Sequence, residues 1–338
     1  MAVGGASFFP PANPLSVTLA ERWDGASWRI VPTPNPPGAA HNSLGRISCP
    51  WQNVCFAVGS SASSSGTTTP LVELWNGSSW SIQPSPNIPN AGLAAVSCSG
   101  LLACTAVGST VFPNPMQPVV ERWDGTGWHL QSTPVVAGSE SSELSAVSCP
   151  LKRTCTAVGK SAGGGFTSPL VERWFGRVNA WGLQSAPKPA GAENAFFSGV
   201  SCPDGPVCVA VGGSQAHFEF DSLLAERRSG PTWSVSPLPD PPAGTSSPFD
   251  FSAVSCPTRR DCHAIGPTQL QIRLGVPGLL AGHFDGSNWQ LESAQATTQE
   301  PAVSFYPGIS CPSRLFCMAV GSWLWKMSGA TLAAKWTP

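Results

Sequence analysis

The segment "SAVSCPLKRTCTAVG", residues 145–159, places two cysteines six positions apart between two short apolar runs. Nearly the same sequence occurs five more times, at residues 45–59, 94–108, 198–212, 252–266 and 307–321. The first cysteines of successive copies are separated by 49, 51, 53, 54 and 55 residues. A spacing near 50 residues is typical of propeller or solenoid repeats.

All twelve cysteines belong to these pairs, which are Cys49/Cys55, Cys98/Cys104, Cys149/Cys155, Cys202/Cys208, Cys256/Cys262 and Cys311/Cys317. One such pair per repeat, without a partner histidine, does not match the ligand spacing of a structural zinc site. We therefore expect six disulfide bonds, each within one repeat, rather than buried free thiols. Disulfides indicate an oxidising compartment, so a secreted or extracellular protein is expected. No signal peptide is visible, and we expect the export signal to precede Met1.

One repeat, beginning at Glu140, contains four short β-like runs, "LSAVSC", "CTAVG", "PLVERW" and "WGLQ". None of them has the apolar period of a helix, and Gly, Pro, Ser and Asn separate them. Four antiparallel strands per repeat predict an all-β fold built from the blades of a β-propeller. The cysteines would close the hairpin between strands one and two, because opposed Cα atoms of antiparallel strands lie about 4.5 Å apart. Small residues in strands one and two place strand one innermost.

A second repeated sequence, such as "RWDGASW" or "LWNGSSW", predicts a tight turn between strands three and four. Its tryptophans would bring apolar area to the outer part of each blade. They are Trp23, Trp28, Trp75, Trp80, Trp123, Trp128, Trp174, Trp181, Trp233 and Trp289.

The count of these elements predicts how the repeats are arranged. The "AVG" element occurs seven times, whereas the "SC" strand and the fourth strand each occur six times. We expect one domain over residues 1–338, a seven-bladed β-propeller of four-stranded antiparallel blades whose first and last blades have three strands. Six blades with overlapping ends is the alternative. The expected units are 1–40, 41–90, 91–139, 140–193, 194–245, 246–300 and 301–338.

The doubled pattern S-V-S-C-P-x4-C-x-A-V-G … L-x-E-R-W-[DN]-G-x-x-W resembles the repeats of largely uncharacterised secreted proteins of actinobacteria and other high-GC bacteria. The resemblance covers essentially the whole chain, and it implies a β-propeller and export but no reaction. The W-D-G-x-x-W turn is also partly similar to the Asp-box hairpin of sialidase-type propellers. The leading Ser is absent and the spacing is shorter here, and such hairpins are structural.

Composition excludes some partners. Charged residues make up 11% of the chain and the net charge is −1, so neither nucleic acid nor an anionic membrane is an expected partner. No apolar run approaches the roughly 18 residues that span a bilayer. A monomer without cofactor, metal or catalytic residues is expected.

Antiparallel connections alternate between the two ends of a blade. The disulfide hairpin and the W-D-G turn should therefore share one end, which is nearly uniform among repeats and is interpreted as scaffold. The loops between strands two and three vary and carry aromatic residues, which is typical of a recognition surface or of unconstrained drift. Candidate ligand-binding residues in these loops are His217, Phe218, Glu219, Phe220, Asp221, Trp323 and Trp325.

Each candidate also has a structural explanation. The alternation in "HFEFD" would put His217, Glu219 and Asp221 on one face, as a metal site, an acid–base cluster or a solvated flap. Trp323 and Trp325 form a stacking platform or the cover of the last blade. The other four histidines show no ligand spacing. A role in five repeats is structural more often than catalytic, so we interpret the repeated charges as ion pairs between blades or a solvated rim. These are Glu21, Glu73, Glu121, Glu172, Glu226, Arg22, Arg122, Arg173 and Arg227.

The favoured hypothesis is a secreted binding module for carbohydrate or a cell-surface polymer. A glycoside hydrolase or lyase is the second hypothesis, and it would need two carboxylates about 5–10 Å apart. Sialidase chemistry also needs an arginine cluster and a tyrosine, and the chain has one tyrosine, Tyr306. A protein-interaction scaffold without a small-molecule site is the third, and the fold alone does not separate it from the first.

Overall fold

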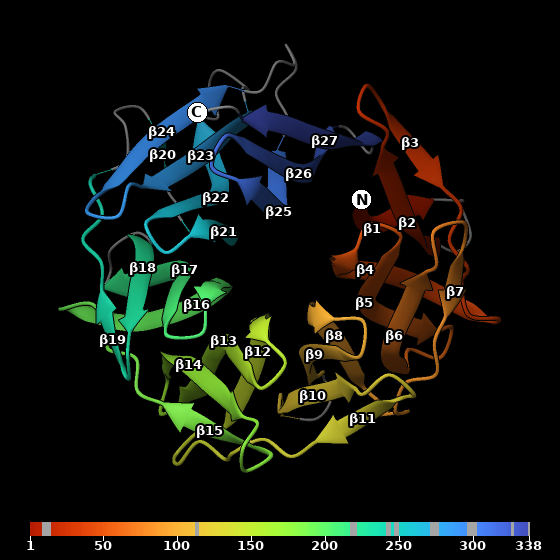
Figure 1. Cartoon of the computed structure of the whole chain (residues 1–338), viewed down its shortest axis with the longest axis horizontal. Helices are drawn as coiled ribbons and strands as arrows, with labels where there is room; N and C mark the ends of the chain where they lie inside the picture. Colours follow the sequence, from red (N-terminus) through yellow and green to blue (C-terminus); the bar gives the residue numbers. More distant parts are fainter. Residues whose placement is uncertain are drawn as a thin grey trace. The chain divides into compact units, whose positions relative to one another are not determined.

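The computed structural model describes residues 1–8, 15–111, 115–216, 222–240, 245–246, 250–270, 277–295, 303–325 and 328–336. Every regular element in these ranges is a β-strand (Figure 1). The same ranges contain no helix long and apolar enough to cross a membrane. The all-β prediction is therefore confirmed.

The N-terminal sheet has seven strands in two groups. The first group is β1 (Ala2–Phe8), β2 (Leu15–Trp23) and β3 (Trp28–Val31), and the second is β4 (Ala39–Trp51), β5 (Val54–Ser63), β6 (Thr68–Trp75) and β7 (Trp80–Ile82). Within each group neighbouring strands are antiparallel. The two groups are joined through the single parallel pair Ser16–His41, between β2 and β4.

Three four-stranded antiparallel sheets follow in the chain. They are β8 (Ala91–Gly100), β9 (Ala103–Thr110), β10 (Pro118–Trp123) and β11 (Trp128–Gln131); β12 (Ser141–Leu151), β13 (Thr154–Gly163), β14 (Phe166–Phe175) and β15 (Ala180–Gln184); and β16 (Ala192–Asp204), β17 (Val207–Ala216), β18 (Ser222–Ser229) and β19 (Thr232–Val235). Their strand order repeats the chain order, so the predicted four-stranded antiparallel unit is confirmed.

The last two sheets have five and three strands. The first contains β20 (Thr245–Ser246), β21 (Ala253–Thr258), β22 (Asp261–Leu270), β23 (Pro277–Phe284) and β24 (Trp289–Gln295), and the second contains β25 (Val303–Ser313), β26 (Phe316–Trp325) and β27 (Ser328–Trp336).

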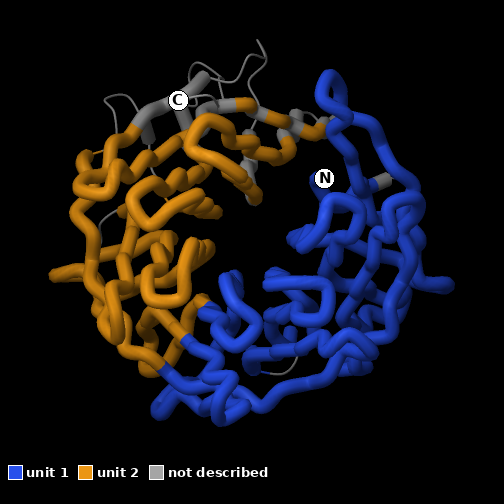
Figure 2. The backbone as a smooth tube through the Cα atoms, in the orientation of Figure 1, with its two compact units in different colours: residues 1–157, 172–183 blue, residues 158–171, 184–338 orange. Residues whose placement is uncertain are grey.

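The chain divides into two compact units (Figure 2). Unit 1 comprises residues 1–157 and 172–183, and unit 2 comprises residues 158–171 and 184–338. Within unit 1, β4 packs beside β8 and β8 beside β12. Within unit 2, β16 packs beside β21 and β21 beside β25. The first strands of successive sheets are thus neighbours inside each unit.

The six predicted disulfides are present, and each joins cysteines six positions apart. They are Cys49–Cys55, Cys98–Cys104, Cys149–Cys155, Cys202–Cys208, Cys256–Cys262 and Cys311–Cys317. The Cα–Cα distances are 4.0–4.1 Å, close to the separation of a directly opposed antiparallel pair. In the sheet of β8 to β11, Cys98 and Cys104 are such partners across the β8–β9 hairpin. The disulfides therefore fasten the hairpin between strands one and two, as the sequence predicts.

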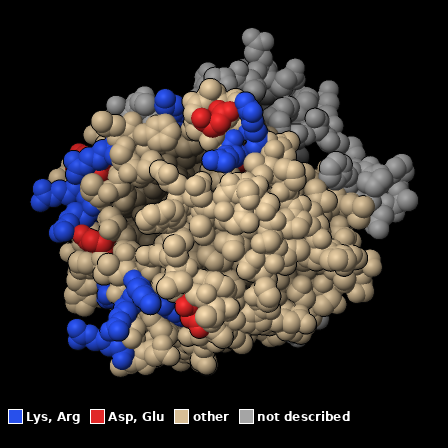
Figure 3. All heavy atoms as spheres, turned by 45° about the vertical axis from the view of Figure 1, so that its right-hand side comes forward, with Lys and Arg blue, Asp and Glu red and all other residues tan. Residues whose placement is uncertain are grey.

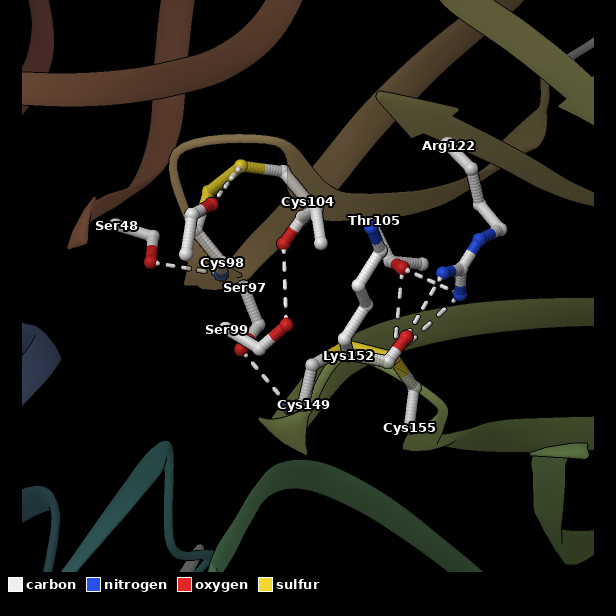
Figure 4. The surroundings of a disulfide bond; sticks show 12 residues. Ser48, Ser97, Cys98, Ser99, Cys104, Thr105, Arg122, Cys149, Lys152 and Cys155 are labelled. Atoms are coloured by element: carbon white, nitrogen blue, oxygen red, sulfur yellow. Dashed lines mark hydrogen bonds between the residues drawn. A yellow bond between two sulfur atoms is a disulfide. The ribbon is translucent and has the colours of Figure 1, made fainter. Parts of the chain in front are cut away.

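In four repeats the serine before the first cysteine joins one sheet to the next within the same unit, and Figure 4 shows two of these serines, Ser48 and Ser97. Ser48 Oγ accepts a hydrogen bond of 3.0 Å from the Cys98 amide, and Ser97 Oγ accepts one of 2.9 Å from the Cys149 amide. Unit 2 repeats the contact, from Cys256 to Ser201 at 2.9 Å and from Cys311 to Ser255 at 3.0 Å. Each bond gives a backbone amide of one sheet an acceptor on the preceding sheet.

The glycine of the "AVG" element lies against a break in the register of strand one. The pairing of β8 with β9 shifts between Leu93 and Ala95, and a Cβ atom on Gly108 would lie only 2.0 Å from the Gly92 carbonyl oxygen. Gly59 and Gly212 meet backbone oxygens of their own first strands in the same way. Glycine is therefore required here by close backbone approach.

The W-D-G turns follow the predicted geometry. Asp124 Oδ1 accepts hydrogen bonds from the Thr126 and Gly127 amides, and Gly125 has a φ of 104°. The flanking Trp123 and Trp128 are directly paired, with ring centroids 6.0 Å apart.

The W-D-G turn also meets the disulfide hairpin of its own sheet. The Trp123 Nε1–H donates a 3.1 Å hydrogen bond to the carbonyl of Leu101, which lies in the β8–β9 hairpin. A Cβ atom on Gly125 would lie within 2.7 Å of Leu102, in the same hairpin. The two turns therefore share one end of the sheet, as the alternation of connections predicts.

We expect Ser97→Ala to lower the free energy of unfolding by about 1–3 kcal/mol, because it leaves the Cys149 amide without its acceptor. Ser81→Ala is the control, since Ser81 is an exposed residue of β7. Urea denaturation of both variants measures the difference. Equal stability of the two variants would show that the serine bond between sheets contributes nothing.

We expect Gly108→Ala to destabilise the protein by about 3 kcal/mol or more, because the Gly92 carbonyl must move to admit a methyl group. Gly100→Ala is the matched control, since no atom lies within 4 Å of a Cβ placed there. Thermal unfolding of both variants is the measurement. A Gly108→Ala protein with the melting temperature of the control would contradict the close approach.

Candidate functional site

Most of the sequence-predicted ligand residues fall outside the described part of the chain. These are His217, Phe218, Glu219, Phe220 and Asp221. Trp323 and Trp325 lie on β26. Trp323 is the cross-strand partner of Ser304 on β25, and Trp325 is the partner of Ser328 on β27. The side chains of both tryptophans lie outside the described part of the structure. The recognition surface proposed for these loops stays a prediction.

The cysteines singled out by the sequence are core residues rather than residues of an accessible site. Cys55, Cys155, Cys208 and Cys262 are buried, and each is at most 1% exposed. Cys262 belongs to the same hydrophobic cluster as Trp289 of its W-D-G-type turn. All four form the predicted disulfides, but no ligand can reach them in the folded chain. Their burial agrees with the structural, disulfide-forming role that the sequence predicts for them.

The repeated glutamates occupy a different place from the one expected. Glu73, Glu121, Glu172 and Glu226 have no exposed surface, and no ion pair joins them to an arginine within the described ranges. Their interpretation as a solvated rim or as ion pairs is therefore wrong. Burial raises the pKa of Glu73 and Glu121 to about 7 and that of Glu172 and Glu226 to about 8.

These carboxyl groups have little hydrogen bonding to offset their burial. Ser85 Oγ donates a 2.7 Å hydrogen bond to Glu121 Oε2, whereas both oxygens of Glu172 and of Glu226 lack a hydrogen-bond partner. A neutral carboxyl group is the form that such surroundings favour. Four separate copies of one buried group form no common site, so we assign them to the core.

Two of the repeated arginines, Arg122 and Arg227, contact aromatic rings of the following sheet, whereas Arg173 contacts Phe175 of its own strand. The Arg122 guanidinium lies 4.4 Å from the centre of the Trp174 ring, and Arg227 lies 6.0 Å from that of Phe284. Arg122 also donates hydrogen bonds to Thr105 Oγ1 at 3.2 Å and to the Lys152 carbonyl at 3.3 Å (Figure 4). The cation–π contacts of Arg122 and Arg227 belong to the packing between sheets.

Unit 2 contains a pocket at the tips of three disulfide hairpins. Its volume is about 450 Å³, and its lining comes from the β16–β17, β21–β22 and β25–β26 hairpins. The lining residues are Pro203, Asp204, Pro257, Thr258, Arg259, Arg260 and Arg314. The pocket therefore lies at the end of the sheets that the sequence analysis interprets as scaffold.

Three arginines give this pocket its charge. Arg259 Nη2 forms a 2.9 Å ion pair with Asp204 Oδ2, and Arg314 Nη2 donates a 3.1 Å hydrogen bond to Thr258 Oγ1. The side chains of Arg259 and Arg314 are 62% and 61% exposed, so their guanidinium groups are accessible. Charged residues make up only 11% of the chain, and on the face drawn in Figure 3 they gather in a few places with wide uncharged surface between them.

A cluster of Asp261, His263 and His283 lies next to the pocket. Asp261 Oδ1 is 3.1 Å from the Nε2 atoms of both histidines, and the two imidazole rings are stacked with their centroids 4.6 Å apart. Arg314, which lines the pocket, has its Nε atom 3.7 Å from Asp261 Oδ2. His263 is completely buried, whereas the His283 side chain is 31% exposed.

Burial lowers the pKa of His263, and the neighbouring His283 lowers it further, while Asp261 acts in the opposite direction. A neutral His263 imidazole is therefore favoured. Sequence spacing alone does not indicate this cluster, because His263 and His283 lie on different strands. The signal that could have found it is the register of β22 against β23, which makes the two histidines direct partners.

We expect Glu172→Gln to remove a pH dependence of stability. The ordinary pKa of 4.5 applies in the unfolded chain and about 8 in the folded one. The contribution of Glu172 to stability is therefore fully present below about pH 4.5 and is lost as the pH rises to 8, because the carboxyl group ionises first in the unfolded chain. At pH 8, Glu172→Gln should exceed the wild type in unfolding free energy by about 4 kcal/mol.

Urea denaturation at pH 5 and pH 8 measures this difference, with Glu140→Gln, an exposed residue, as the control. The control should keep the pH dependence of the wild type. The burial argument fails if Glu172→Gln and the wild type lose the same stability between the two pH values.

Comparisons with known proteins identify structural likenesses only. No family model matches the chain, and no curated protein does. One similar solved structure is a protein of unknown function from Dyadobacter fermentans DSM 18053, with 10% identity, a TM-score of 0.53, and coverage of 86% of this chain and 93% of that one. Another is a fucose-specific lectin from Aleuria aurantia, with 12% identity, a TM-score of 0.45, and coverage of 85% and 94%. The first of these shows a shared fold.

Proposed function

We propose that the chain is an exported seven-bladed β-propeller that binds an anionic carbohydrate of an extracellular or cell-surface polymer. One feature supports the architecture and another supports export. Dividing the N-terminal sheet at the single Ser16–His41 pair leaves a three-stranded group at each end of the described chain, as the repeat count predicts. Six disulfides without a free cysteine support export, because such bonds persist in oxidising compartments.

The ligand class rests on one observation, the arginine-lined pocket of about 450 Å³ in unit 2. That volume is typical of small-ligand sites. A guanidinium group presents paired N–H donors that match a carboxylate, sulfate or phosphate group. The Thr258 hydroxyl adds a polar group suited to sugar hydroxyls. An acidic sugar therefore suits this pocket better than a neutral one.

Binding is favoured over glycoside hydrolysis by the acids around the pocket. Asp204 is the one carboxylate among the residues that line it, and it forms an ion pair with Arg259. Hydrolysis by the usual routes needs two carboxyl groups facing the bond that is cleaved. The described lining supplies no such pair.

The proposal predicts that a uronic-acid polymer such as polygalacturonate binds the protein and that neutral dextran does not. We expect the double variant Arg259→Gln with Arg260→Gln to weaken polygalacturonate binding at least about 10-fold, because hydrogen bonds to charged groups contribute about 1.5–3 kcal/mol each. Isothermal titration calorimetry at two salt concentrations measures both the affinity and its electrostatic part.

The matched control is Lys152→Gln with Arg153→Gln, which removes the same charge from the equivalent hairpin between β12 and β13. This control should change the affinity less than about twofold. The proposal is wrong if correctly folded wild-type protein binds no acidic polysaccharide. Equal losses of affinity in the two double variants would instead show that binding depends on net positive charge and not on this pocket.

A further inference from the structure

Asp261, His263 and His283 present three metal-ligand groups on one face of a sheet. Asp261 and His263 are two positions apart on β22, so their side chains point to the same side. His283 on β23 is the direct antiparallel partner of His263. The strand register therefore brings the three groups together without any loop having to rearrange.

Their distances match a coordination sphere. Asp261 Oδ1 lies 3.1 Å from each Nε2 atom, and the three ligand atoms all lie within 4.8 Å of one another. Zinc binds histidine nitrogen and carboxylate oxygen at about 2.0–2.2 Å, which places neighbouring ligand atoms about 3.0–3.5 Å apart. The two rings are parallel to within 5°, so binding requires them to tilt. The partly exposed His283 side chain has room to do so.

The surroundings favour one-oxygen coordination by Asp261. Arg314 Nε lies 3.7 Å from Oδ2, which leaves Oδ1 facing the two histidines. Such an outer partner orients a ligating carboxylate. The sulfurs of Cys311 and Cys317 are also close to His263, but their disulfide excludes them as thiolate ligands.

The fold itself does not require histidines at these positions. In β9 and β10 the equivalent positions are occupied by Thr105 and Arg122. In β26 and β27 they are occupied by Met318 and Lys335. Each of these pairs is also a direct cross-strand pair. In β9 and β10 the arginine contacts a tryptophan of the next sheet instead. A pair of histidines with an aspartate is thus a departure from a pattern that packs well without it.

We propose that Asp261, His263 and His283 bind one divalent transition-metal ion, with Zn²⁺ as the ion that matches two imidazoles and one carboxylate. Water or an acidic group of a ligand completes the coordination sphere. The site shares Arg314 with the pocket, so a bound cation would add to the positive charge there. Metal binding is independent of the proposed carbohydrate, since all three ligands come from the chain.

Titration of chelator-treated full-length protein, without a polyhistidine tag, with ZnCl₂ tests the proposal. We expect one Zn²⁺ per chain, micromolar or tighter affinity, and a higher melting temperature when Zn²⁺ is bound. His283→Arg should reduce the affinity at least about 30-fold, because losing a direct ligand costs at least as much as losing an outer partner. Arginine occupies the equivalent position in β10, so this variant is compatible with the fold.

His129→Gln is the matched control. His129 Nε2 lies 3.1 Å from Asp124 Oδ2 at the surface, which is a histidine–aspartate pair without a second histidine. The His129→Gln substitution should leave the Zn²⁺ affinity and stoichiometry unchanged. Absence of Zn²⁺ binding by folded wild-type protein, or unchanged binding by His283→Arg, would overturn the proposal. Neither result bears on polysaccharide binding, which is measured separately in Zn²⁺-free buffer.

Discussion

The hydrogen bond from a cysteine amide to the serine hydroxyl of the preceding sheet is the contact on which the arrangement of successive sheets depends. The same dipeptide acts in both directions, since Ser97 accepts from Cys149 while the adjacent Cys98 donates to Ser48. Each sheet is thereby held to its neighbours at the residue where its own hairpin is fastened by a disulfide. Loss of this acceptor would cost the partly buried amide its hydrogen bond to the neighbouring sheet, which favours one position of the strand. This contact gives a structural reason for the serine that precedes the cysteine at Ser48, Ser97, Ser201 and Ser255.

Fixing the hairpin at its base leaves its tip free to vary. Behind the cysteines, the bulge of strand one and the glycine opposite it are tightly constrained, as the contact between Gly108 and the Gly92 carbonyl shows. Beyond the cysteines lie only a few residues, and in unit 2 these include Arg259, Arg260 and Arg314. Accessible charge is thus placed on a rigid base, which lowers the conformational entropy lost when a ligand binds.

The sequence predicts well the features that depend only on residues within one hairpin. The disulfides and the W-D-G turns join residues a few positions apart, so spacing alone identifies them. The burial of Glu172 could not be predicted in this way, because it depends on the atoms that surround the middle of strand three in the folded chain. The cluster of His263 and His283 was missed for a related reason. The two residues are twenty positions apart, and only the register of β22 against β23 makes them neighbours.

A repeat protein offers an internal comparison that a single-copy fold lacks. Residues that serve packing recur at equivalent positions, as the buried glutamates do, so recurrence argues for structure. Residues that serve a ligand need a single asymmetric arrangement, and they therefore stand out where one repeat departs from the others. The pair Thr105 with Arg122 shows what packing alone requires at two facing positions. The replacement of such a pair by His263 and His283, beside Asp261 and an arginine-lined pocket, is the departure for which packing gives no reason.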